Sequence, residues 1–228
     1  MISKILLFAL LNQWIYDPTK FTNDTLFKPL YIGKRFGIVK DYNDDCVIVH
    51  RGSESIDDVF HDFMSQITDD CTKDGYSKYF YDSFMEYSHE LEREMKNLID
   101  KKICYEFLAT GHSLGGSAAI INAEHPYVKH VATYGSPKTC CNNRNSMNGP
   151  GDLHRVINGD IDNNTNDPIP ALPKHKNFNN CGDKIVNVEK VTRVKYESSP
   201  RFAVEPINGK IRNIKKHHIE SYIDKLKE

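Results

Sequence analysis

The sequence carries little net charge. Its 30 Lys and Arg residues face 31 Asp and Glu residues, which gives a formal net charge of −1 at pH 7. Nucleic-acid-binding domains usually show a strong basic excess, so this balance argues against a nucleic-acid partner. The region from Lys184 onward is mildly basic, with 11 Lys and Arg residues against 6 Asp and Glu residues. Such a region is typical of a solvated surface, and it also fits attraction to anionic lipid headgroups.

Long hydrophobic runs are missing as well. A transmembrane helix needs about 20 apolar residues, and the sequence has no such run, so we predict no transmembrane segment. The apolar run Ile5–Leu11, preceded by Lys4, fits either a short signal peptide or an N-terminal helix packed on the core. We favour the helix because Asn12, Gln13 and Trp14 follow where signal cleavage requires small residues. We expect a soluble protein, for which cytoplasmic and secreted locations both stay open.

Cysteine is too sparse for a disulfide-dense scaffold. The six cysteines form no C-x-x-C pair and no zinc-type Cys/His spacing, so we predict no metal site. Cys104 lies in an apolar run and is expected to be a buried free thiol. Cys140 and Cys141 are adjacent and are not expected to pair with each other. The spacing of the six cysteines is compatible with either free thiols or disulfides.

Internal repeats, heptads and low-complexity linkers do not occur, and 228 residues fit one domain spanning residues 1–228. Short apolar runs alternate with longer segments of helical period. The expected strands are 30–40, 46–50, 103–109, 128–134 and 153–158, and the expected helices are 76–100, 117–123 and 217–226, with a hairpin at 201–214. Strands that alternate with helices predict an α/β fold, in which helices cover both faces of a mostly parallel central sheet.

The segment Gly111-His112-Ser113-Leu114-Gly115 is a G-x-S-x-G motif between an expected strand and an expected helix. A serine on such a turn has a strained backbone, and the glycines remove side chains that would clash there. The turn lifts the hydroxyl above the sheet edge and places it near a helix N-terminus, whose N–H groups favour a developing negative charge. The motif and its setting predict Ser113 as a nucleophile.

A serine nucleophile needs a general base, usually His, and an acid that orients it. In α/β-hydrolases these residues follow the serine in the order acid, then His. The residues after Ser113 that fit this order are Asp160, Asp162 and Asp167 as acids, and His175, His217 and His218 as bases. His175 follows Asp167 too closely and is expected on a surface loop. The residue pattern alone leaves the choice open among the acids and between the paired histidines.

Five segments together resemble the class 3 (fungal-type) lipase family of the α/β-hydrolase superfamily. They occur in the family's order and are 110–116, 133–137 (Thr-Tyr-Gly-Ser-Pro), 155–158, 167–173 (Asp-Pro-Ile-Pro-Ala-Leu-Pro) and 217–222. The resemblance implies an α/β-hydrolase fold. It also implies Asp167 as the acid, and it favours His217 over His218 as the base.

The same resemblance maps residues 47–53 onto the family strand that leads into the oxyanion loop. It implies that the backbone N–H groups of Ser53 and Leu114 stabilise the oxyanion. His50 departs from the family pattern, which usually has Phe there. In the family the next segment, here Glu54–Phe63, is a lid over the site. Its apolar residues share one helical face, which fits a mobile lid or a fixed amphipathic helix.

The sequence therefore predicts a serine esterase or lipase that hydrolyses lipid esters, either triacylglycerol or phospholipid acyl chains, through a Ser-His-Asp triad. The expected partners are a lipid ester substrate and, transiently, a lipid interface, and no metal or organic cofactor is implied. An alternative is a catalytically silent hydrolase-fold protein that binds a lipid or a partner. Competent residues at all three triad positions argue against it. Amide or thioester hydrolysis is a further possibility, because the same triad permits it.

Overall fold

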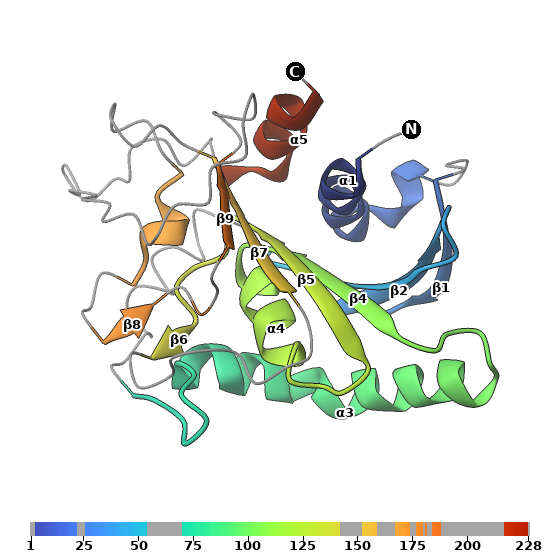
Figure 1. Ribbon diagram of the computed structural model, residues 1–228, viewed down its shortest axis with the longest axis horizontal. Helices are drawn as coiled ribbons and strands as arrows, with labels where there is room; N and C mark the ends of the chain where they lie inside the picture. Colours follow the sequence, from blue (N-terminus) through green and yellow to red (C-terminus); the bar gives the residue numbers. More distant parts are fainter. Residues whose placement is uncertain are drawn as a thin grey trace.

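Strands and helices alternate in the middle of the chain, between residues 46 and 134, as the hydrophobic pattern predicts (Figure 1). The computed structural model describes residues 3–21, 26–53, 70–141, 152–158, 167–173, 177–179, 181, 184–187 and 217–227. Several sequence predictions fall outside these residues: the hairpin at 201–214, the lid segment Glu54–Phe63, and the candidates Asp160, Asp162 and His175.

The described residues form a central sheet of seven strands in the order β1-β2-β3-β4-β5-β7-β9. β1, β2 and β3 pair in an antiparallel manner, and the strands from β3 to β9 are parallel. The strands are β1 (Phe27–Ile32), β2 (Phe36–Asp41), β3 (Cys46–His50), β4 (Phe107–His112), β5 (Val128–Tyr134), β7 (Asp152–Ile157) and β9 (Lys184–Asn187). β6 (Cys140–Cys141) and β8 (Phe178–Asn179) pair with each other in an antiparallel manner and form a second, two-stranded sheet. All residues of β3 and β4 are buried, which explains why most residues of both strands are apolar.

Helices cover both faces of the sheet (Figure 1). One face packs against α3 (Lys78–Asp100) and α4 (Leu114–Asn122), whose apolar residues share a core with β2, β3 and β4. The other face packs against α1 (Lys4–Tyr16) and α5 (Ile219–Lys227). Short 3-10 turns lie at Pro18–Phe21 and Ile169–Ala171. The α/β-hydrolase fold predicted from the sequence is therefore confirmed.

The N-terminal apolar run forms the predicted packed helix. The side chain of Ser3 caps α1 by accepting a hydrogen bond from the Leu6 N–H, at 3.2 Å. Leu7, Leu11 and Trp14 are fully or almost fully buried against the sheet. Within the described part of the chain, no helix combines the length and the apolar character needed to cross a bilayer.

The expected strand 30–40 is in fact two strands. β1 ends at Ile32, Gly33-Lys34-Arg35 form a turn in which the Gly33 N–H donates to the Phe36 carbonyl at 2.9 Å, and β2 then runs back. Because residues on both sides of the turn are apolar, hydrophobicity alone hides the reversal. The expected strand 103–109 lies further along, at Phe107–His112, so β4 leads directly into the serine turn.

The expectation that Cys104 is a free thiol is wrong, because Cys104 forms a disulfide with Cys46. Cys46 begins β3, and β3 pairs in parallel with β4 so that Cys46 lies opposite Phe107. This register brings residues just before β4 next to the start of β3. Cys140 and Cys141 do not pair with each other, as predicted; Cys140 bonds to Cys181 and Cys141 to Cys71.

Candidate active site

The predicted site residues gather where the parallel strands end. Ser53 follows β3, Ser113 follows β4, and Gly135 follows β5. Asp167 is joined to the end of β7 by a hydrogen bond from its N–H to the Asn158 carbonyl, at 2.7 Å. Because the carboxyl ends of parallel strands meet at one edge, the sheet brings residues distant in sequence into one site.

Ser113 occupies a strained turn between β4 and α4. Its φ of 57° and ψ of −127° lie in a region that side-chain-bearing residues rarely adopt. The turn is held by the Ser113 N–H, which donates to the Tyr134 carbonyl at 3.0 Å. Gly115 makes the turn possible, since a Cβ there would lie 2.3 Å from the His50 carbonyl oxygen. The G-x-S-x-G segment thus adopts the strand-turn-helix geometry that the sequence predicts.

The two predicted oxyanion donors lie on adjacent segments. Leu114 is the first residue of α4, where backbone N–H groups have no partner inside the helix. Ser53 follows Gly52, and a Cβ built on Gly52 would lie 3.4 Å from the Ser113 Cβ. The loop after β3, which is the predicted oxyanion loop, therefore lies against the serine turn. Both Ser53 and Leu114 are partly exposed.

Asp167 and His217 form a buried pair. The His217 Nδ1 lies 2.8 Å from the Asp167 Oδ2, and both side chains are almost completely buried. The Tyr222 hydroxyl donates to the same oxygen, and the Ile169 N–H donates to Oδ1 at 2.9 Å. Burial and the negative charge of Asp167 raise the pKa of the Tyr222 hydroxyl well above its usual value, so it stays a donor. The carboxylate is thus fixed by three donors, and the imidazole can carry its proton on Nδ1.

His218 does not share this arrangement. It is exposed, and its carbonyl accepts a hydrogen bond from the Ser221 N–H at 3.0 Å as α5 begins. Of the two adjacent histidines, His217 is therefore the one that contacts Asp167. The base and acid that the resemblance implied lie together on the side of the sheet that also carries Ser113.

His50 lies outside the reacting groups. Its Nδ1 is 3.0 Å from the Tyr87 hydroxyl of α3, and its Nε2 accepts from the Asn122 amide of α4 at 3.2 Å. Burial lowers the pKa of the imidazole to about 3, so the ring is neutral. A polar residue thus replaces the usual Phe without an unsatisfied buried group, and it links β3 to both helices on that face.

Sequence reasoning missed three residues around the site. Tyr222 donates a hydrogen bond to Asp167, His112 contacts the backbone of His217, and Tyr16 contacts His112 from the end of α1. The tyrosine that follows the base and the histidine within the serine motif were visible signals. Nothing in the sequence around Tyr16 points to the site, because its contact depends on how α1 packs.

Gly135 allows Asp167 and His217 to approach the end of β5. Its φ is 57°, and a Cβ there would lie 2.8 Å from both the Asp167 Oδ2 and the His217 Nδ1. Gly135→Ala should therefore displace the pair and lower kcat/KM for a soluble ester at least about 100-fold. Gly75→Ala is the matched control, since Gly75 also has positive φ, at 79°, but lies in a turn closed by a hydrogen bond from its N–H to the Thr72 carbonyl, at 3.1 Å. Equal activity of Gly135→Ala and wild type would contradict the assignment of this pair.

This chain is similar to one known protein family and to several solved structures. The family described as Lipase (class 3) matches residues 47–177. A search of curated proteins gives no match. Among solved structures, a triacylglyceride lipase from Rhizomucor miehei superimposes with a TM-score of 0.69 at 18% identity, covering 83% of this chain and 80% of the other.

Two further structures are similar to this chain. A triacylglycerol lipase described as having a serine protease triad as its catalytic centre gives a TM-score of 0.68 at 19% identity, covering 83% of this chain and 80% of the other. The Lip2 lipase of Yarrowia lipolytica gives 0.58 at 18% identity, covering 82% and 80%. At these identities the structural similarity establishes the fold, and the family match covers more than half of the chain.

Proposed function

The chain belongs to the class 3 lipase family and is a carboxylic ester hydrolase, and we propose that it hydrolyses lipid esters through an acyl-enzyme on Ser113. The observation that carries this proposal is the buried Asp167–His217 pair at the sheet edge that bears the strained Ser113 turn. A nucleophile, a base and an orienting acid are the parts that acyl transfer requires.

In the proposed reaction, the Ser113 Oγ attacks the ester carbonyl while the His217 Nε2 accepts its proton. Asp167 keeps the other proton on Nδ1 and stabilises the imidazolium that forms. The backbone N–H groups of Leu114 and Ser53 bind the oxyanion of the tetrahedral intermediate. His217 then protonates the leaving alkoxide, and water, activated by the same base, releases the fatty acid. No step in this scheme uses a metal or an organic cofactor.

A catalytically silent binding protein is the alternative. Backbone strain at Ser113 costs about 1–3 kcal/mol and usually marks a functional site, and a binding protein has no need of it. A panel of p-nitrophenyl butyrate, p-nitrophenyl octanoate and the matching anilide tests the proposal. We expect ester turnover with little anilide turnover. A folded protein that cleaves neither ester would favour the binding alternative, and comparable anilide cleavage would favour an amidase.

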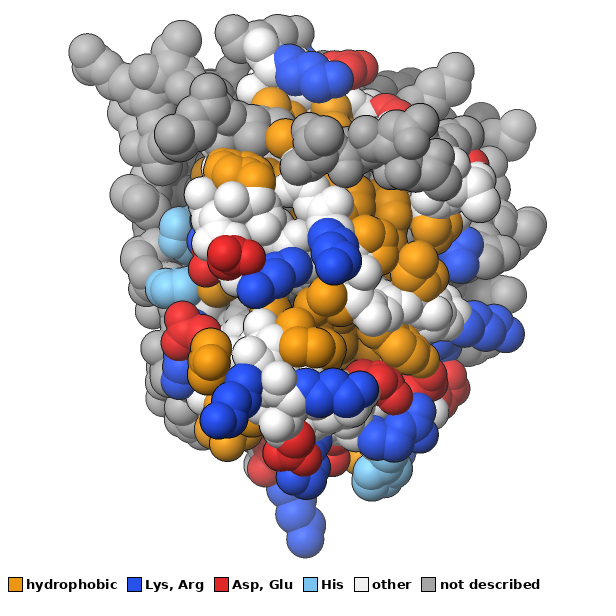
Figure 2. Space-filling view, turned by 90° about the vertical axis from the view of Figure 1, so that its right-hand side faces the viewer, with side chains coloured by type: hydrophobic (Ala, Val, Ile, Leu, Met, Phe, Trp, Pro, Cys, Tyr) orange, Lys and Arg blue, Asp and Glu red, His pale blue; other side chains and the backbone are white. Residues whose placement is uncertain are grey.

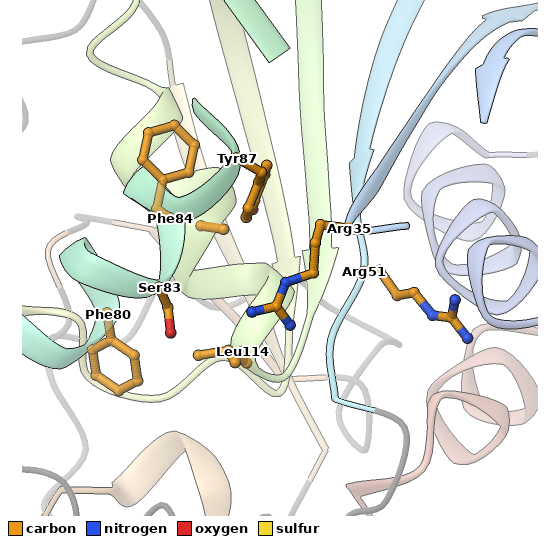
Figure 3. Close-up of a pocket in the computed structure, with 8 residues that line it drawn as sticks. Arg35, Arg51, Phe80, Ser83, Phe84, Tyr87 and Leu114 are labelled. Atoms are coloured by element: carbon orange, nitrogen blue, oxygen red, sulfur yellow. The ribbon is translucent and has the colours of Figure 1, made fainter. Parts of the chain in front are cut away.

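The ester substrate is either a triacylglycerol or a phospholipid. The similar solved structures are triacylglycerol lipases, whereas one feature beside the site favours a phospholipid. Arg35, in the β1–β2 turn, directs its guanidinium into a shallow depression toward Leu114 (Figure 3). Arg51 also borders this depression, but its side chain points away toward α1. A guanidinium near the oxyanion site could bind a phosphate beside the ester.

Arg35→Gln should lower kcat/KM for a short-chain anionic phospholipid about tenfold relative to p-nitrophenyl butyrate, because a charge-assisted hydrogen bond is lost. Glu86 pairs with Arg35 at 2.9 Å. Glu86→Gln removes this competing carboxylate, so it should raise kcat/KM for the phospholipid relative to p-nitrophenyl butyrate. Arg35→Lys is the charge-conserving control. An equal loss of kcat/KM on both substrates would show that Arg35 does not select phospholipids. A neutral glyceride would then be the favoured substrate.

Contact with a lipid interface is the second part of the proposed function. The β1–β2 turn lies at the catalytic edge of the sheet, since Phe36 pairs with His50 at the end of β3. Ile32 before this turn is 52% exposed, and Lys34 within it is exposed. The surface at the β1 edge shows hydrophobic side chains among Lys, Arg, Asp and Glu side chains (Figure 2). An exposed apolar residue next to a lysine, as at Ile32 and Lys34, suits contact with the surface of an anionic lipid layer.

A further inference from the structure

A chain of hydrogen bonds runs behind the proposed site and joins three segments. The Tyr16 hydroxyl at the end of α1 lies 3.1 Å from the His112 Nδ1. The His112 Nε2 lies 2.5 Å from the carbonyl oxygen of His217. The backbone of Gly52 also hydrogen-bonds to the Tyr16 hydroxyl, and a Cβ on Gly52 would lie only 2.2 Å from it. The oxyanion loop, the serine turn and the base segment are thus connected through two side chains.

The direction of each hydrogen bond follows from the groups involved. A carbonyl only accepts, so the proton of His112 must be on Nε2, and Nδ1 must then accept from the Tyr16 hydroxyl. The hydroxyl oxygen accepts in turn from the Gly52 N–H. The order is therefore Gly52 N–H to Tyr16, Tyr16 to His112, and His112 to the His217 carbonyl. This assignment gives each of the three donors an acceptor.

Burial keeps both side chains in the neutral form that this order requires. Burial lowers the pKa of the His112 imidazole well below its usual value, and the neighbouring His217 lowers it further. Burial also raises the pKa of the Tyr16 hydroxyl, although the Arg51 guanidinium opposes the rise. Arg51 holds the tyrosine from two sides, through its guanidinium over the ring and a 3.3 Å hydrogen bond to the Tyr16 carbonyl.

The His112 ring also packs against the His217 ring, with centroids 4.6 Å apart and planes inclined by 30°. His112 therefore contacts the base twice, through its backbone and through its ring. A neutral ring in this position does not repel the imidazolium that forms on His217 during catalysis. Asp167 fixes one edge of His217, and His112 fixes its backbone and one face.

We propose that Tyr16 and His112 are positioning residues that hold the oxyanion loop and the base in register with Ser113. The proposal rests on the proposed function, and it assigns a role in the active site to α1, which lies outside the family match at 47–177. Loss of the Tyr16 hydroxyl removes the acceptor of the Gly52 N–H next to Ser53, and the donor to His112. Both losses displace groups that act in the transition state, so kcat should fall while KM changes little.

The test compares Tyr16→Phe with wild type on p-nitrophenyl butyrate. We expect kcat to fall about 10- to 100-fold, with KM within about twofold. The rate at which a p-nitrophenyl phosphonate labels the serine should fall by a similar factor, since labelling needs the same base and oxyanion donors. His112→Asn provides a second variant, and it should lower both rates at least as much.

Asn12→Ala is the matched control, because Asn12 also joins α1 to the sheet through a buried hydrogen bond, 2.7 Å to the Thr110 hydroxyl. It should lower Tm without lowering kcat more than about twofold. If Tyr16→Phe loses only Tm, as Asn12→Ala does, the positioning role is refuted. Absence of wild-type turnover in the same assay would instead refute the proposed function, so the two failures are distinguishable.

Discussion

Ser113→Ala should abolish hydrolysis of p-nitrophenyl butyrate and octanoate while leaving the protein folded. Removal of the nucleophile from a serine triad lowers kcat by roughly five to six orders of magnitude. The substitution keeps Cβ, so the strain at φ 57° is the same in both proteins. Circular dichroism and Tm should therefore change little. The measurement is turnover of wild type and Ser113→Ala side by side, with equal protein concentrations.

A nearby serine provides the control for this experiment. Ser117 lies one turn further along α4, buried, where its hydroxyl accepts a hydrogen bond from the Thr139 hydroxyl at 2.9 Å. Ser117→Ala should keep activity within about threefold, because this hydroxyl points into the core. A fluorophosphonate should label wild type on the peptide that contains Ser113, and it should not label Ser113→Ala. Equal turnover of Ser113→Ala and wild type would place the reaction elsewhere in the molecule.

The fold could be predicted from the sequence where one local pattern decides one element. β5 occupies Val128–Tyr134 as expected, because a short segment that ends in the buried residues 131–134 and is followed by a glycine turn has few alternatives to a strand. The prediction merged β1 and β2, since hydrophobicity is the same on both sides of Gly33 and the reversal depends on strand pairing. The Cys46–Cys104 disulfide was missed for a related reason: it depends on the register of β3 against β4.

The residues of the candidate site show the same contrast between local patterns and contacts of distant segments. Ser113 could be predicted from the G-x-S-x-G motif with the expected strand before it and the expected helix after it, because the strained turn is a local structure with its own glycine requirement. The pairing of Asp167 with His217 joins residues 50 positions apart, and residue order alone left several acids and two histidines open. Only a family resemblance reduced that choice. Tyr16 reaches His112 across 96 positions, and no pattern along one segment encodes such a contact.

Asp167→Asn should lower kcat/KM for soluble esters about 10⁴-fold while the fold stays intact. Three donors converge on the carboxylate, from His217, Tyr222 and the Ile169 N–H. An asparagine offers one oxygen and presents an NH₂ group in place of the other. When the oxygen serves the Ile169 N–H, the NH₂ group faces the His217 Nδ1. The imidazole must then carry its proton on Nε2, where it cannot accept the proton of Ser113.

Three further variants test whether the loss of activity in Asp167→Asn reflects the role of Asp167 as the acid. Tyr222→Phe removes a donor but leaves the acceptor for His217, so its loss should be about tenfold or less. Asp160→Asn and Asp162→Asn change the other two acids that the residue order left open, and both should keep nearly full activity. If Asp167→Asn stays active while one of those two loses activity, the acid must be reassigned. If Tyr222→Phe loses as much as Asp167→Asn, catalysis depends on the position of the carboxylate more than on the proton it holds on His217.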